Sequence, residues 1–305
     1  MSKASMKYVD VSPEVGMLNG FNRFDYEWRK AMAEIIDNSI DAIDEKIKSN
    51  PDFSGEIHVL AHETDSRVTD VFVFDDGCGM TPEELTKALK IGDSNKASTQ
   101  SNIGVFGMGL KTAGQSIGQA ITVYSRKDPK SDIYSIEWNP ERMRNSGAWL
   151  AELKKADKDI VDFFNEQIGQ SSGTMIHISG ADVRGKLPLR NSNINSSLFD
   201  TFSRIYRRTL SKDSECNVDF KITLGAKKKY VVSSDTIVDP LYISDEPDLT
   251  RWLVGGPNIY KDLEFEDDKG VIHKFKIRLA WTTMGSGSGP TKASMLGQGI
   301  NGAYK

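Results

Sequence analysis

The sequence predicts an α+β fold, a sandwich in which helices cover one face of a mixed β-sheet. Three observations support this fold class. Residues 26–48 contain no glycine or proline, and Ala31, Ile35 and Ile43 recur there at roughly helical spacing. Residues 71–74, Val-Phe-Val-Phe, form a short apolar run typical of a buried strand. The other predicted helices and strands follow in an order that lacks strict βαβ alternation.

Composition bounds the class of protein. The chain has 305 residues with 38% hydrophobic side chains, which is enough for a sizeable core and predicts two domains. Its net charge of −4 creates no global positive field toward nucleic acid, and local basic patches stay open. Two cysteines, Cys78 and Cys216, and the lack of a long apolar run predict a reduced, cytoplasmic protein with no membrane segment.

The remaining elements are predicted from hydrophobic runs and turn residues. Thr81, followed by a proline and two acids, is a typical helix start. In chain order we expect strands at 56–61 and 67–74, helices at 81–90 and 111–117, strands at 120–126 and 133–138, a loop at 139–147, a helix at 157–168, a strand at 174–179, a helix at 198–210, and strands at 218–224, 230–232 and 273–281.

Composition also predicts the domain organisation. Residues 180–197 are rich in Gly, Pro, Asn and Ser, so we place a boundary there, with a first domain at 1–185 and a smaller second domain at 186–305. A long polar stretch at 91–104 is expected to form a mobile lid.

Three blocks of residues carry chemistry. Glu34, Asn38 and Asp41 are spaced i, i+4 and i+7, which puts two carboxylates and an amide on one helix face. The predicted strand at 67–74 runs directly into 75–80, Asp-Asp-Gly-Cys-Gly-Met. Residues 103–111, Ile-Gly-Val-Phe-Gly-Met-Gly-Leu-Lys, precede a helix, where glycines let backbone N–H groups approach an anion. Alone, each block is equally compatible with a surface helix or loop.

Together the blocks resemble the GHKL family of ATPases, which includes the ATPase chain of gyrase, MutL, the large heat-shock chaperones, histidine kinases and the microrchidia (MORC) proteins. The pattern E-x-x-x-N-x-x-D-A at 34–42 resembles the family's N-box, and D-x-G-x-G-M at 75–80 resembles its adenine box. G-x-x-G-x-G-L-K at 104–111 resembles its phosphate loop, and Gly-Thr-Met-Ile at 173–176 resembles the strand that closes the adenine pocket. Residues 91–96 are most similar to the microrchidia branch.

The resemblance implies a Bergerat-type ATP-binding sandwich followed by a transducer-like (S5-type) domain that is incomplete at its C-terminus. It implies binding of ATP and Mg²⁺, slow hydrolysis, and ATP-gated homodimerisation, so that the protein is a molecular clamp or switch. The output of the switch would lie in other domains or partners, and a DNA or protein partner stays open. No membrane partner is expected.

The resemblance also assigns roles to residues. Glu34 would be the base that orients and deprotonates water, and Asn38 would offer Mg²⁺ a hard oxygen ligand. Asp75, with Thr174, would accept a hydrogen bond from the adenine amino group, which disfavours guanine. Lys292 would reach the γ-phosphate from the second domain. The residues expected at the nucleotide are Asn38, Asp41, Ala42, Asp75, Gly79, Met80, Ser94, Lys96, Gly104, Val105, Phe106, Gly107, Met108, Gly109, Leu110, Lys111 and Thr174.

Two alternatives stay open at this point. The first is a histidine kinase or protein kinase core, which uses the same fold but for which no phosphoacceptor histidine helix is found upstream. The second is a non-hydrolysing module in which ATP acts as a dimerisation ligand.

Overall fold

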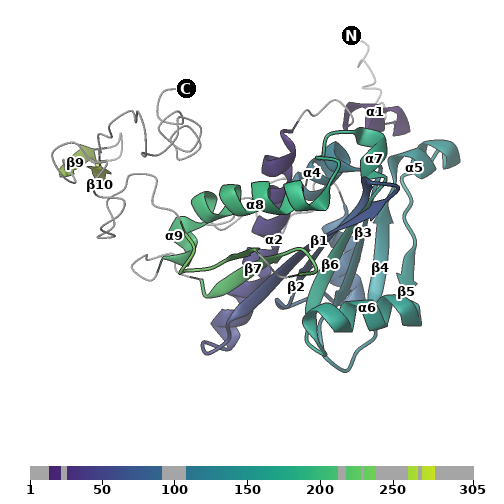
Figure 1. Ribbon diagram of the computed structural model, residues 1–305, viewed down its shortest axis with the longest axis horizontal. Coiled ribbons are helices and arrows are strands. Elements are labelled where there is room, and N and C mark those ends of the chain that lie inside the picture. The colour runs from purple at the N-terminus through teal and green to yellow at the C-terminus, as the bar shows by residue number, and fades with distance from the viewer. Residues whose placement is uncertain are drawn as a thin grey trace, which may run out of the picture.

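The computed structural model describes residues 14–21, 26–90, 108–211, 218–227, 230–237, 260–266 and 270–278. Its centre is an eight-stranded sheet in the order β5-β4-β3-β6-β2-β1-β7-β8 (Figure 1). The strands are β1 Gly55–Thr64, β2 Arg67–Asp75, β3 Ala120–Arg126, β4 Tyr134–Trp138, β5 Leu153–Lys155, β6 Gly173–Ser179, β7 Phe220–Leu224 and β8 Tyr230–Val232. All neighbours pair antiparallel except β1 and β7, which are parallel, so the sheet is mixed as predicted. Strands β9 Tyr260–Glu266 and β10 Ile272–Arg278 form a separate antiparallel pair.

Helices cover both faces of this sheet, with more of them on one face than on the other. They are a 3-10 turn at Val15–Met17, α1 Leu18–Phe21, α2 Trp28–Ser49, α3 Pro82–Ala88, α4 Gly109–Ile117, α5 Pro140–Ser146, α6 Lys158–Ile168, α7 Ala181–Arg184, α8 Asn191–Ile205 and α9 Arg207–Leu210. The main core joins α2, α4 and α8 to one sheet face. A smaller core packs Phe163 and Phe164 of α6 against Phe72 and Phe74, on the opposite face (Figure 1). The predicted α+β sandwich is confirmed, with α6 as an addition on the second face.

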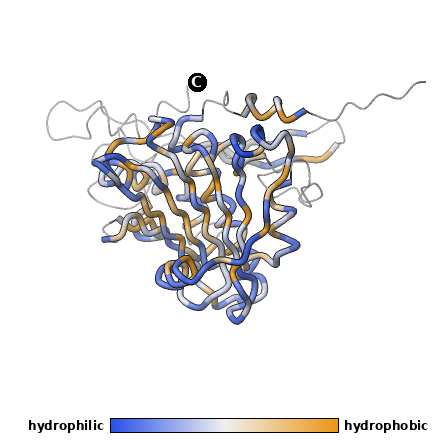
Figure 2. The backbone as a smooth tube through the Cα atoms, turned by 90° about the vertical axis from the view of Figure 1, so that its right-hand side faces the viewer, coloured by the Kyte–Doolittle hydropathy of each residue, from blue (hydrophilic) through white to orange (hydrophobic). Residues whose placement is uncertain are grey.

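The helix α2 forms where the apolar spacing predicts it. Its buried residues recur along one stripe and include Ala31, Ile35 and Ile43, and it ends just before Asn50-Pro51. Strands β1 and β2 follow as an antiparallel pair, with Val59 opposite Val73. Figure 2 shows that hydrophobic residues (orange) concentrate along the strands in the interior, whereas the loops are mostly hydrophilic (blue). Alternation along the strands thus separates the two cores.

Two local predictions were wrong. Residues 139–147 form α5 rather than a loop, because the Asn139 side chain accepts a hydrogen bond from the Arg142 amide and Pro140 occupies the first helical position. Gly147 ends the helix with φ of 67°. The helix expected at 198–210 begins already at Asn191, since Ile194 and Leu198 are both buried on one face. A turn at Tyr206 separates α8 from α9.

The sheet continues across the boundary predicted at residues 185/186. Strand β7 pairs in parallel with β1, with Ile57 opposite Ile222, and β8 follows it. Leu198, Phe202 and Ile222 belong to the same core as Ile35 of α2. The sheet and core of the first predicted domain therefore include residues that the sequence assigned to the second.

Several predictions fall on residues that lie outside the described ranges. They concern the whole of the lid at 91–104, Cys216, and the site residues Ser94, Lys96, Gly104, Val105, Phe106, Gly107 and Lys292. Among the helices that are described, none combines the length and the apolar composition needed to cross a bilayer.

Candidate nucleotide site

The first residues of the candidate site lie where α2 meets the start of α4. A Cβ built on Gly109, the first residue of α4, would lie 3.1 Å from Oε2 of Glu34. The carboxylate of the N-box-like block and the helix that follows the glycine-rich block are therefore neighbours. The free N–H groups at a helix start favour an anion, so this junction suits a phosphate chain. Met108 and Leu110, beside Gly109, are half-buried.

Asn38 lies one turn beyond Glu34 and is exposed. Its side-chain Nδ2 donates a hydrogen bond to the Glu34 carbonyl oxygen at 2.7 Å. This bond orients the amide and directs Oδ1 away from the helix backbone. An amide oxygen beside a carboxylate suits Mg²⁺, which takes few protein ligands and completes its octahedron with phosphate and water. No group of three or more acidic, histidine or cysteine side chains gathers for a metal anywhere in the described ranges.

Asp75, at the end of β2, is nearly fully buried, with 3% of its surface exposed. Its carboxylate accepts hydrogen bonds from the Ser39 hydroxyl at 3.1 Å and from the Gly77 amide at 3.1 Å. Burial raises the pKa of Asp75 to about 7, although these two donors act in the opposite direction. A buried carboxylate with few donors is a strong acceptor for a further N–H group, as the adenine hypothesis requires.

The loop after Asp75 packs against α2 and β3. The Cys78 amide donates to the Ala42 carbonyl oxygen at 3.0 Å, which ties the loop to the N-box helix. Gly79 has φ of 60°, and a Cβ there would lie 2.0 Å from the Arg126 carbonyl oxygen. Only glycine fits this position. Asp41, one residue before the end of the motif at 34–42, is half-buried.

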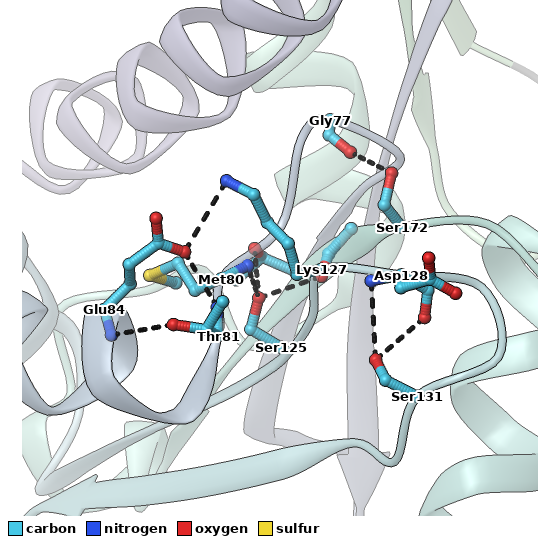
Figure 3. Close-up of polar contacts among 11 residues, drawn as sticks. Gly77, Met80, Thr81, Glu84, Ser125, Lys127, Asp128, Ser131 and Ser172 are labelled. Carbon is cyan, nitrogen blue, oxygen red and sulfur yellow. Dashed lines mark hydrogen bonds and ion pairs between the residues drawn. The ribbon is translucent and has the colours of Figure 1, made fainter.

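A serine and threonine cluster supports the loop from the neighbouring strands (Figure 3). The Met80 amide donates to Ser125 Oγ at 2.9 Å, and Ser125 Oγ lies 3.0 Å from Thr174 Oγ1. The Ser172 hydroxyl donates to the Gly77 carbonyl oxygen at 2.7 Å. Thr174 pairs with Asp75 across the sheet, so the strand β6 holds the threonine beside the candidate adenine acceptor.

Sequence reasoning missed Ser39, Ser125 and Ser172. Ser39 had a visible signal, because it is a polar residue four positions from both Ile35 and Ile43 on the buried stripe of α2. Ser172 directly precedes the Gly-Thr-Met-Ile block at 173–176, which marks its neighbourhood, whereas Ser125 had no signal, since Met80 is 45 residues away along the chain.

Lys111, predicted at the phosphates, lies in the interior between α4 and α3. Its side chain is fully buried, with 0% exposure, and Nζ donates to the carbonyl oxygens of Ala88 at 3.2 Å and Lys90 at 3.3 Å. Nζ also lies 5.8 Å from the centre of the Trp138 ring. Burial lowers the pKa of Lys111 to about 8. These contacts join α4 to the C-terminal end of α3, and a phosphate contact stays a prediction.

The comparisons with known proteins agree with this arrangement. Residues 26–174 match the profile of a family described as histidine kinase-, DNA gyrase B-, and HSP90-like ATPase. Protein MICRORCHIDIA 5 of Arabidopsis thaliana is 23% identical over 297 residues, which cover 83% of this chain and 40% of that protein. Protein MICRORCHIDIA 4 of Arabidopsis thaliana is 30% identical over 119 residues, covering 38% of this chain and 14% of that protein. The human MORC family CW-type zinc finger protein 1 is 32% identical over 99 residues, covering 32% of this chain and 9% of that protein.

The chain thus spans well under half the length of these curated relatives. The family match implies ATP binding, and it covers α2, the loop after β2, α4 and the start of β6. Residues 26–174 therefore match the GHKL ATPase family, and the chain is similar to the microrchidia proteins.

Proposed function

We propose that this chain is a Mg²⁺-dependent ATP hydrolase in which Glu34 activates the attacking water. The observation that supports this most is the closeness of the Glu34 carboxylate to Gly109 at the start of α4. Phosphates held before that helix would lie beside the carboxylate. Hydrolysis needs a water that is oriented and deprotonated near the γ-phosphate, and a carboxylate at that junction can do both.

Mg²⁺, when bound, would neutralise charge on the β- and γ-phosphates. Within the chain, Asn38 is the residue to hold it through Oδ1, since Nδ2 is engaged by the Glu34 carbonyl oxygen. Asp75 would bind the adenine amino group, with Thr174 beside it across the sheet. The hydrogen bond from Ser39 would keep the Asp75 carboxylate oriented.

The decisive experiment measures phosphate release and ATP affinity for three proteins. They are the wild type, Glu34→Ala, and Glu45→Gln as a control that changes an exposed glutamate elsewhere on α2. We expect Glu34→Ala to lose turnover by about 10²-fold or more while it still binds ATP. Glu45→Gln should match the wild type.

The same measurement separates the alternatives. ATP binding without turnover in the wild type would favour the non-hydrolysing module. Phosphate that stays on the protein when γ-labelled ATP is used would favour a kinase. Wild-type protein that does not bind ATP would contradict the whole proposal.

We also propose that ATP binding drives homodimerisation, with residues after the eight-stranded sheet forming the transducer-like part that carries Lys292. The support is the family resemblance and the similarity to the microrchidia proteins. Light scattering of Glu34→Ala with and without Mg-ATP tests it, because a variant that keeps ATP uncleaved should accumulate the dimer. A mass that stays monomeric with saturating ATP would exclude ATP-gated dimerisation.

A further inference from the structure

Tyr206 connects the end of α8 to the helix that carries Glu34. The tyrosine is only 3% exposed. Its hydroxyl lies 2.9 Å from Asp37 Oδ1 and 3.1 Å from the Ala33 carbonyl oxygen. In an α-helix the amide of residue 37 bonds the carbonyl of residue 33, so the hydroxyl contacts both ends of one turn. That turn is the one that contains Glu34.

The aromatic ring of Tyr206 is held from two other elements. Its centre lies 5.5 Å from that of Phe202 on α8 and 6.3 Å from that of Phe220 on β7, edge to face in the second case. All three rings belong to the main core. The hydroxyl is therefore a fixed point against which the turn of α2 is placed.

The contact between Tyr206 and α2 is polar, which is unusual for a buried contact. The pKa of Asp37 is raised to about 6, because the effect of burial outweighs the opposing effect of the hydrogen bond from the tyrosine hydroxyl. An aliphatic pair would fill the same space without a desolvation cost. The single hydroxyl proton is shared between the carboxylate and the carbonyl oxygen, so the contact adds direction and opposes both rotation and sliding of the helix turn.

We infer that Tyr206 is a positioning residue for Glu34, acting through Asp37 and the Ala33 carbonyl; this rests on the proposed function. Among the described residues, the hydrogen bonds of the tyrosine hydroxyl go to Asp37 and to the Ala33 carbonyl oxygen, and none goes to Glu34 itself. The effect of the tyrosine is to fix where the Glu34 carboxylate lies relative to Gly109. Small displacements of a catalytic group lower turnover strongly, whereas ATP binding depends on many other contacts.

Tyr206 lies outside the region that matches the family profile. The family match ends at residue 174, and Tyr206 follows 32 residues later. Residues after the matched region would then complete its catalytic geometry, and a fragment that stops at residue 174 would turn over ATP poorly even if it folded.

The test compares Tyr206→Phe with Ser203→Ala. Ser203 is in α8, three residues before Tyr206, and is 1% exposed, but its hydroxyl donates to the Phe199 carbonyl oxygen within α8. Both variants lose one buried hydroxyl, and only the first loses a link to α2. We expect kcat to fall about tenfold in Tyr206→Phe, with ATP affinity within about twofold of wild type. Ser203→Ala should retain both values.

A second variant and a second readout keep the inference testable if Tyr206→Phe folds poorly or the wild type proves inactive. Asp37→Ala removes one of the two acceptors and leaves the ring in the core, so it should also lower kcat, and the double variant should be no slower than Tyr206→Phe. Hydrogen exchange of the nucleotide-free protein should be faster at amides 33–38 in Tyr206→Phe and Asp37→Ala than in Ser203→Ala. This readout does not depend on turnover.

Unchanged exchange at amides 33–38 in both variants would overturn the inference. So would equal losses of kcat in Tyr206→Phe and Ser203→Ala, or a loss of ATP affinity that parallels the loss of kcat. An inactive wild type with faster exchange in the variants would contradict the proposed function and leave the role of Tyr206 in placing the helix turn supported.

Discussion

Gly109 and Glu34 face each other across the junction of α4 and α2, at a distance that leaves no room for a side chain on the glycine without movement of the carboxylate. A Cβ at Gly109 would lie 3.1 Å from Glu34 Oε2. This contact joins two sequence blocks that are far apart in the chain. A substitution at Gly109 should therefore lower catalytic turnover without lowering stability.

We predict that Gly109→Ala lowers kcat by about 3- to 10-fold, because the methyl group displaces the Glu34 carboxylate by a few tenths of an ångström. Alanine is the better helix former, so the melting temperature should stay the same or rise. Steady-state kinetics and thermal unfolding of the two proteins check this. A kcat equal to that of the wild type would show that Glu34 tolerates the displacement or is not the base.

Gly79→Ala should abolish ATP binding and destabilise the fold by several kcal/mol, because the methyl group would meet the Arg126 carbonyl oxygen at 2.0 Å in a left-handed backbone. Gly147→Ala is the matched control, since φ there is 67° and nothing lies within 4 Å. The control should lose only about 1 kcal/mol, from the backbone strain. Urea unfolding and ATP titration measure both effects, and equal losses in the two variants would mean that the contact with Arg126 contributes nothing.

Asp75 should make the stability depend on pH below neutrality. Burial raises its pKa in the folded protein to about 7 from 3.8, so the folded state holds a proton that the unfolded state releases. The stability that this proton contributes is fully present below about pH 4 and is lost as the pH rises through about 7. The total change in the free energy of unfolding is on the order of 4 kcal/mol. Asp75→Asn removes the titration. We therefore expect the variant to gain stability over the wild type between pH 4 and 7, as measured by urea midpoints.

A difference between Asp75→Asn and the wild type that stays constant over this range would contradict the raised pKa. Asp70→Asn is a suitable control, because Asp70 is on the same strand and pairs with His177 at 2.8 Å nearer the surface.

In alkaline solution Lys111 should make the stability depend on pH in the opposite direction. Burial lowers the pKa of its ammonium group to about 8 from 10.5, so above pH 8 the unfolded state binds the proton more tightly than the folded state. The stability of the wild type should rise relative to Lys111→Met between pH 8 and 10.5, by on the order of 3 kcal/mol. Thermal unfolding of both proteins across this range tests it, and parallel curves would contradict the buried position.

The sequence predicted those parts of the fold that have local signals. The apolar stripe of α2 and the run at 71–74 identify two elements, and Thr81 correctly marked the start of α3, where its side chain and Glu84 form a capping box. At 139–147 the same kind of signal was present but was interpreted as a loop. The motif blocks indicated the candidate site, and the contact between Gly109 and Glu34 agrees with their joint use.

Non-local contacts carried no such signal. The hydrogen bond from Tyr206 to the Ala33 carbonyl oxygen spans 173 positions, and no periodicity or spacing marks it. The parallel pairing of β1 with β7 also depends on a return of the chain after residue 211, which the change in composition at 180–197 did not indicate. Topology of this kind follows from the whole core and cannot be read from a local window.

The parallel pairing of β1 with β7 sets an order of events during synthesis of the chain. Gly55 leaves the ribosome early, but its partner Phe220 follows only after most of the sheet has been made. Until then one edge of β1 stays uncovered. Because such distant pairings form slowly and leave strand edges open, the nascent chain should depend on chaperones until β7 emerges, and the turn that holds Glu34 should be the last part of the site to become rigid.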